Sequence, residues 1–334
     1  METLEIQPHN SNGVISFDEG QSIQEPSSVS TDKPFIQANT TEVSLQEIKD
    51  NHIIPVFIKD NEPLISHADF IETTLKVASD VYSGETILSP TVRVSHPVKG
   101  RIPEAKNKPA NELEEWEKTI YFERMAFIIE VPSISDVIGG NTLSLTIGGV
   151  KSYGMDNLYS RKSDQHFKIF VGFNNRVCLN LKIWSDGYMG DLKVTTIGQL
   201  SACIRSLLEQ HNAVFQLNQM KMLCDYSLSE SQFAHLIGKA RMYQHLPKDV
   251  QRDIPQLMFG DQQISSVVRD YYRDNSFCRD EQGNINLWRL YNLFTEANKS
   301  SYIDNFIDRS VNSYHFIEKI KWTLEEKGSN WYLS

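Results

Sequence analysis

The chain has 334 residues, of which 40% are hydrophobic and 23% are charged, a balance that is typical of a soluble globular protein. The formal net charge is -10, and no run approaches the roughly 20 apolar residues that a membrane helix needs. Residues 1–10 also lack the basic and apolar regions of a signal peptide, so we expect a cytoplasmic protein that does not enter a membrane.

Residues 1–40 predict a disordered, acidic tail. They are rich in Ser, Gln, Asn and Thr, and their isolated apolar residues cannot bury enough surface to offset the entropy lost on ordering. Residues 1–50 contain nine acids and two lysines, a balance of -7, which leaves only -3 for the rest of the chain. Most of the net charge therefore lies outside the predicted folded body.

Residues 41–195 predict two short helices followed by strands that pair mainly antiparallel. Ser44 with Glu47, and Ser66 with Asp69, have the spacing of capping boxes at helix starts. Further on, apolar and polar residues alternate in short runs that are separated by Pro and Gly, as in half-buried strands.

The clearest hairpin signal joins residues 166–173 to residues 176–184. Asn174 and Asn175 lie between the two runs, and Asn tolerates the left-handed backbone conformation of a tight turn. We therefore predict that the chain reverses at these two residues.

Residues 196–334 change to a helical period. The apolar spacing and capping signals predict several helices, among them 261–274, 286–297, 301–309 and 310–327. Because strands come first and helices afterwards, the sequence predicts an α+β fold. The two regions would pack as one domain or as two closely associated subdomains.

The helix predicted at 286–297 carries two stripes of side chains. One stripe is apolar and faces a core: Leu287, Leu290, Tyr291 and Phe294. The second is mixed and lies beside it: Trp288, Asn292 and Thr295, with Glu296 next to them. An indole can stack on a base and an amide can pair with a base edge. The same groups can instead close the core and satisfy backbone atoms of the strand region, and the sequence leaves both interpretations open.

Residues 141–200 contain seven bases and four acids, so this segment is net +3 within an acidic protein. Basic side chains with aromatic residues between them are typical of a sheet that follows a nucleic-acid backbone: Arg161, Lys162, His166 and Lys168. Arg241 lies in a second basic stretch, at 239–252. A solvated strand face and ordinary surface ion pairs would have the same composition.

Asp186 and Asp191 lie on either side of Gly187 and Gly190, and could hold a divalent cation or serve acid–base chemistry. Such a segment more often marks a turn. The four cysteines have no close spacing, and the sequence contains no GxxxxGK[ST], HExxH or GxSxG motif. We therefore expect no cofactor and no resident metal.

Two segments also carry a family resemblance. The run Val177-Cys178-Leu179-Asn180, together with the spacing of Trp288, Asn292, Thr295 and Glu296, resembles the phage/plasmid-like proteins. Residues 146–154 and 284–304 resemble, more closely, one uncharacterised family with a domain of unknown function, carried by gut bacteria and their mobile elements, over roughly residues 45–325. The resemblance implies a protein of a mobile element with a role near DNA. It also marks the characteristic positions Cys178, Asn180, Trp288, Asn292, Thr295 and Glu296.

The leading hypothesis is a non-catalytic protein that binds single-stranded nucleic acid, or a protein that handles it. The site would combine the basic side chains with the Trp288 stripe. One alternative is a metal-dependent enzyme that acts on phosphodiesters through Asp186, Asp191 and Glu296. Another is a protein–protein adaptor linked to host defence.

Overall fold

A six-stranded antiparallel sheet forms the centre of the part of the chain that the structure, a computed structural model, describes. The described residues are 14–17, 21–24, 34–52, 64–156, 164–273, 278–326 and 328–334. In spatial order the sheet consists of β11 (Leu181–Val194), β10 (Gln165–Asn175), β9 (Asn141–Ser152), β8 (Arg124–Ile138), β5 (Thr91–Val94) and β3 (Thr41–Val43).

The other described strands form small sheets: β1 (Val14–Phe17), β2 (Gln21–Gln24) and β4 (Ile87–Leu88); β6 (Pro97–Arg101) and β7 (Lys118–Phe122); β12 (Ser227–Leu228) and β13 (Ile285–Asn286). The described α-helices are α1 (Leu45–Asn51), α2 (His67–Val81), α3 (Ile197–Gln210), α4 (Ala213–Met222), α5 (Glu230–Tyr243), α6 (Lys248–Gln251), α7 (Asp261–Arg273), α8 (Leu287–Asn298) and α9 (Ile303–Glu326). Among them no helix is both long and apolar enough to cross a membrane.

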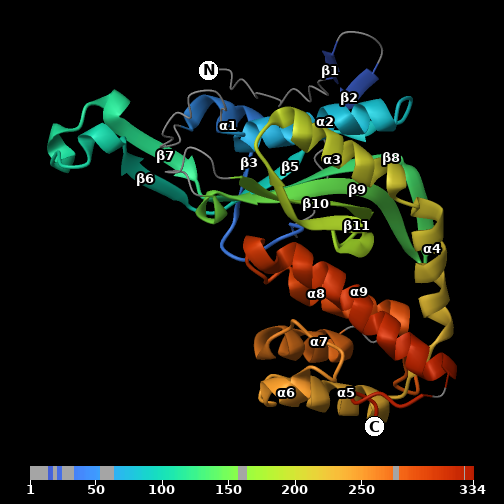
Figure 1. The fold of residues 1–334 in the computed structure, drawn as a ribbon. Coiled ribbons are helices and arrows are strands. Elements are labelled where there is room, and N and C mark those ends of the chain that lie inside the picture. The colour runs from blue at the N-terminus through green and yellow to red at the C-terminus, as the bar shows by residue number, and fades with distance from the viewer. Residues whose placement is uncertain are drawn as a thin grey trace, which may run out of the picture.

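Helices cover both faces of the sheet (Figure 1). Helices α1, α2 and α3 lie on one face, and α8 and α9 lie on the other, with α5, α6 and α7 further out. Helix α4 runs along one side and connects the two layers, while the β6–β7 hairpin projects away from the body at the opposite side. The predicted α+β fold, with strands first and helices afterwards, is confirmed.

The predicted helix starts are confirmed by their hydrogen bonds. Oγ of Ser44 accepts a hydrogen bond from the backbone N–H of Glu47 at 3.0 Å. Ser66 and Asp69 form a complete capping box at the start of α2, in which each side chain accepts from the other residue's backbone N–H. A local spacing of three residues was sufficient to place both helix starts, because the cap is made within one turn.

The β10–β11 hairpin exists, but its predicted turn is wrong. Asn174 and Asn175 are the last residues of β10, and the chain reverses over residues 176–180, where Leu179 has a positive φ of 53°. Oδ1 of Asn175 accepts a hydrogen bond from the N–H of Val177 at 3.0 Å. The Asn side chain therefore stabilises the beginning of a longer turn instead of forming a two-residue one.

The predicted turn around Asp186 is also wrong, since β11 continues through it. Ile183 pairs with Gly172 and Tyr188 pairs with Phe170, so residues 184–187 stand opposite the single residue between them. This irregularity is a bulge at the edge of the sheet, and it places Asp186 on the exposed surface. The bulge holds the extra residues within β11, and pairing with β10 resumes after them, which the local Asp-Gly signal could not reveal.

The helices predicted at 301–309 and 310–327 are one helix, α9. No Gly or Pro interrupts the sequence between them. The small polar residues at the predicted junction are buried and bonded: Oγ of Ser310 accepts from Nδ2 of Asn298 at 2.9 Å, and Oγ of Ser313 donates to the carbonyl of Ser310 at 2.7 Å. These polar side chains therefore find hydrogen-bond partners inside the protein, and the helix continues without a break.

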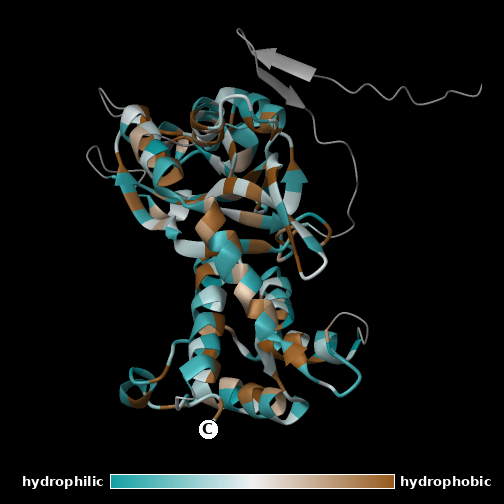
Figure 2. Cartoon of the chain, turned by 90° about the vertical axis from the view of Figure 1, so that its right-hand side faces the viewer, coloured by the Kyte–Doolittle hydropathy of each residue, from teal (hydrophilic) through white to brown (hydrophobic). Residues whose placement is uncertain are grey.

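One hydrophobic core links the strand-rich and helical regions. Phe70 of α2 packs against the rings of Phe127 and Phe167, with centroids 5.0 and 4.9 Å away. Gly149 of β9 makes room for Phe70, because a Cβ atom there would lie 2.4 Å from its ring. Figure 2 shows hydrophilic and hydrophobic residues interspersed along the helices of both layers.

The described end of the predicted tail packs on the body. Phe35 and Ile36 are buried in a second apolar cluster together with Phe306 of α9, and the backbone N–H of Gln37 donates to the carbonyl of Lys299 at 2.8 Å. Residues 34–40 therefore belong to the folded body. The strands β1 and β2 also fall within the predicted tail, most of whose other residues lie outside those that the structure describes.

Candidate functional site

The two segments that carry the family resemblance meet where the β10–β11 hairpin faces α8. Nδ2 of Asn180 donates to the carbonyl of Asn292 at 3.4 Å. Nζ of Lys182 donates to Oγ1 of Thr295 at 2.6 Å. All four residues are buried, so the second stripe of α8 faces the sheet and not the solvent.

A second lysine completes this cluster. Nζ of Lys299 donates to the carbonyl of Cys178 and forms an ion pair with Glu296, at 2.9 Å. The pKa of Lys182 is lowered to about 7, mainly by burial; the charge of Lys299 acts in the same direction, while Cys178 and Glu296 act in the opposite direction. The characteristic positions of the sequence therefore surround a buried amine that is largely neutral above pH 7.

Trp288 is fully buried and occupies a space that the β8–β9 turn leaves open. Its Nε1 donates to Oδ1 of Asn141 at 3.2 Å. A Cβ atom on Gly139 would lie 2.5 Å from Cδ1 of Trp288, and Gly139 and Gly140 both have positive φ, 54° and 81°. The tight turn and the indole therefore depend on the same glycine.

The basic candidates bind carboxylates of the chain itself. Nζ of Lys168 donates to Oδ2 of Asp308 at 2.6 Å and to the carbonyl of Asp304 at 2.7 Å. Arg241 forms an exposed ion pair with Asp261 at 3.0 Å. Each cation is thus neutralised where it stands.

His166 contacts a carboxylate as well, since its Nδ1 and its backbone N–H lie 3.3 and 2.7 Å from Oδ1 of Asp156. Oδ2 of the same carboxylate binds Lys151 at 2.8 Å in a fully buried ion pair. Arg161 and Lys162, the other two basic candidates, lie outside the described residues.

The three acidic candidates, Asp186, Asp191 and Glu296, do not form a cluster. Asp191 pairs with Lys193 at 3.1 Å, Glu296 belongs to the buried cluster, and Asp186 lies in the bulge of β11. Within the described ranges, no three His, Cys, Asp or Glu side chains lie so that they could hold a metal ion.

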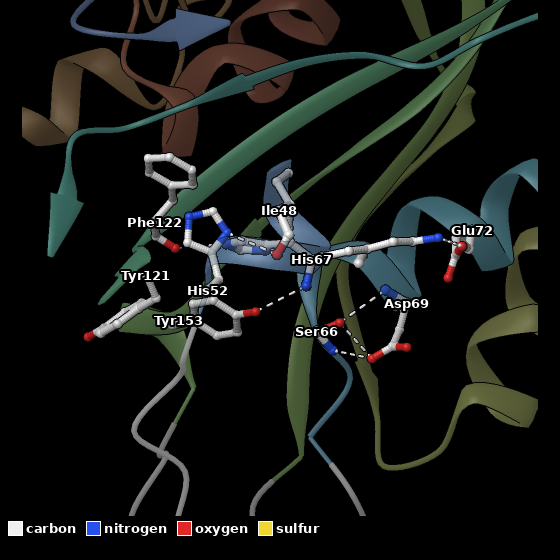
Figure 3. A pocket seen from close by; sticks show the side chains of 11 residues that line it. Ile48, His52, Ser66, His67, Asp69, Glu72, Tyr121, Phe122 and Tyr153 are labelled. Carbon is white, nitrogen blue, oxygen red and sulfur yellow. Dashed lines mark hydrogen bonds and ion pairs between the residues drawn. The ribbon is translucent and has the colours of Figure 1, made fainter. Parts of the chain in front are cut away.

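A cavity of about 250 Å³ lies between α1, the start of α2, the end of β7 and the short helix η4 (Tyr153–Met155). Figure 3 shows the rings of His52, Tyr121, Phe122 and Tyr153 on one side of it. The capping box of α2 and the side chain of Glu72 lie on the other side. Segments that are far apart in sequence therefore contribute its walls.

His67 is a deeply buried polar side chain of the cavity wall, at 3% exposure. Its Nε2 lies 2.8 Å from the carbonyl oxygen of Phe122, and its backbone N–H donates to the hydroxyl of Tyr153 at 3.0 Å. Burial lowers the pKa of His67 to about 3. Its ring is therefore neutral at neutral pH, and no described residue bonds to its Nδ1.

The charged groups of the wall are two carboxylates and one ammonium. Oδ2 of Asp69 accepts from the N–H and the hydroxyl of Ser66, at 2.8 and 2.7 Å. Glu72 forms an ion pair with Lys49. The wall thus has a formal charge of -1, which favours a neutral or cationic occupant.

Among the protein-family models, one matches residues 16–333; its description is "Domain of unknown function, B. Theta Gene description (DUF3871)". The chain belongs to this family. A search of curated proteins and a search of solved structures found no match. The predicted resemblance to an uncharacterised family is confirmed, and the match shows that the DUF3871 domain includes both the sheet and the helical region.

Sequence reasoning did not find the cavity of this DUF3871 protein. The spacing of Ser66 and Asp69 predicted a helix start, but gave no sign that the start lines a cavity. His52 and His67 lie fifteen residues apart, on different helices or their ends, without a motif spacing. The site becomes recognisable only when the folded structure brings these residues together.

Proposed function

We propose that this DUF3871 protein is a binding protein that holds a small organic ligand in the cavity between α1, α2, β7 and η4. The proposal depends on one observation, a cavity whose walls combine aromatic rings with a few fixed polar groups. This combination is typical of ligand sites. The volume of about 250 Å³ lies a little below the roughly 300–1,000 Å³ of pockets for drug-sized molecules, so we expect a ligand of one or two rings.

The chemistry of the wall favours binding over catalysis. A general acid or base works best when its pKa lies near the working pH. The pKa of His67, about 3, is far below that range, and Asp69 is held in the capping box. These groups can orient a ligand, but they are poorly suited to move a proton.

A fragment screen against the full-length protein tests this proposal. Histidine-ring NMR signals would report binding at His52 and His67. Ala68→Met, which places a larger side chain in the cavity wall, should abolish the hits. Lys76→Met places the same side chain at an exposed position of α2 that does not line the cavity, and it should leave binding unchanged. Hits that survive Ala68→Met, or a library without any hit, would refute the proposed function.

Binding of single-stranded nucleic acid, a link to a mobile element and an adaptor role in host defence stay predictions from the sequence. For nucleic acid to bind at the predicted residues, Lys168 and Arg241 would have to exchange their carboxylates for phosphates, and Trp288 would have to leave the core. A fluorescence anisotropy titration with single strands at low salt decides this point, because phosphate contacts are strongest there.

A further inference from the structure

His67 and His52 line the cavity, and each has one ring nitrogen bonded to a backbone carbonyl and a second that can accept a hydrogen bond. We propose that the cavity binds a flat aromatic ring that carries an amino group, and that His67 and His52 accept hydrogen bonds from this group. The inference rests on the proposed function and names the chemical class of its ligand.

The tautomer of His67 follows from its contact with Phe122. A carbonyl oxygen can only accept, so Nε2 of His67, 2.8 Å away, must carry the ring hydrogen. Because the ring is neutral, Nδ1 then has a lone pair and no hydrogen. This buried acceptor has no donor among the described residues. A buried polar atom without a partner costs free energy. Because Nδ1 is covered in this structure, a ligand with an N–H group would supply the missing donor after a small shift of the cavity wall that uncovers it.

His52 presents a second acceptor for the same reason. Its Nδ1 lies 3.1 Å from the carbonyl oxygen of Ile48 and therefore carries the hydrogen. Burial lowers the pKa of His52, so that Nε2 keeps its lone pair at neutral pH. Its ring is fixed by Phe122, whose centroid lies 4.3 Å away. The two imidazoles are close enough for a charge on His52 to lower the pKa of His67.

Two acceptors in one cavity select an amino group over a carbonyl group. An amino group has two N–H donors and can bond to both nitrogens. A carbonyl oxygen would instead face two lone pairs and leave both histidines without donors. A site that is built for one hydrogen-bonding pattern discriminates strongly against the analogue that lacks it.

The remaining walls restrict the shape and charge of the ligand. The rings of Tyr121, Phe122 and Tyr153 line the cavity, and aromatic faces favour a flat partner that can stack on them or meet them edge to face. The carboxylates of Asp69 and Glu72 outnumber the ammonium of Lys49, so an anionic group would be repelled from the wall. The preferred occupant is thus a neutral or cationic amino-substituted ring.

Two matched pairs of probes test this inference on the full-length protein. The compounds 9-methyladenine and 1-methylcytosine carry an amino group, whereas 9-methylpurine and 1-methyl-2-pyrimidinone carry only a hydrogen at the same position and gain no ring N–H. Isothermal titration should give a dissociation constant about tenfold lower for the amino member of each pair, as expected for one or two hydrogen bonds. The single-stranded oligonucleotides dA10 and dT10 form a third pair, which reports whether the ring is bound as part of a strand or as a free molecule.

His67→Phe removes the acceptor and keeps a flat ring, so 9-methyladenine should then bind no better than 9-methylpurine. His235→Phe is the control, because His235 is exposed and does not line the cavity. Equal affinities within every pair on the unaltered protein would overturn the inference, whether or not the variant folds. If fragments of other classes still bind the cavity in that case, the proposed function stands without the inference. If nothing binds, both fail.

Discussion

Replacing Lys182 by Met should stabilise the protein at pH 7, and the gain should shrink as the pH rises. The amine of Lys182 is fully buried between α8 and the sheet, with its Nζ 5.5 and 4.7 Å from the ring centroids of Trp288 and Tyr291. Its Nζ donates a hydrogen bond to Oγ1 of Thr295. The side chain must therefore lose its proton, or pay for a buried charge, when the chain folds.

The pKa of Lys182 falls from 10.5 to about 7 on folding. Between these values the unfolded chain binds more protons than the folded one, so stability rises with pH. From a difference of this size, the buried amine costs about 4 kcal/mol at pH 7 and about 1 kcal/mol at pH 9.5. Met is unbranched and only one heavy atom shorter than Lys, and it loses the hydrogen bond to Thr295, which costs about 1 kcal/mol at every pH.

Urea unfolding of both proteins, followed by tryptophan fluorescence at several pH values between 7 and 9.5, measures the difference. We expect the advantage of Lys182→Met to be about 3 kcal/mol at pH 7 and close to zero at pH 9.5. The contributions of the other titrating groups are the same in the unaltered protein and in Lys182→Met, so they cancel in the difference between the two. Lys193→Met, at a partly exposed lysine on the same strand, should show no comparable trend. A constant difference between the two proteins across the pH range would refute the reasoning.

Three further predictions concern the cavity wall and the buried side of α8. Because the pKa of His67 lies near 3 in the folded protein and at 6.5 in the unfolded chain, stability should fall as the pH drops below 6.5, and His67→Phe should reduce that loss in urea midpoints. Gly139→Ala should lower the melting temperature much more than Gly140→Ala: both residues have positive φ, but only Gly139 contacts Trp288. Asn292→Ala removes a buried hydrogen bond to the carbonyl of Trp288, at 2.8 Å, and should cost about 1–2 kcal/mol in urea unfolding without changing ligand binding in the cavity.

Features that depend on a few neighbouring residues could be predicted from the sequence. The capping box of Ser66 and Asp69, the alternating strands and the helical period after residue 196 all arise within one element, and the structure contains them. The order of strands and helices was then enough for the fold class. The predicted turn at Asn174 and Asn175 was wrong because both residues pair with β9 and so continue β10, and a local pattern does not reveal that partner strand.

The sequence also singled out α8 and the Cys178–Asn180 segment, but it did not show that these two segments are in contact. Periodicity shows that Trp288, Asn292 and Thr295 share one side of a helix. It contains no information about what that side faces. Only the tertiary structure showed that the stripe is buried against β11.

The candidate ligand site depended entirely on tertiary structure. The walls of the cavity come from the end of α1, the start of α2, the end of β7 and η4, which are joined by long connections and share no motif. The acceptor state of His67 depends on a carbonyl 55 residues away, and on burial by several elements. The sequence determined which elements form, because local spacing governs them. Packing decided which side chains are neutral, buried or left without a partner, because desolvation and hydrogen bonding depend on neighbours that only folding brings together.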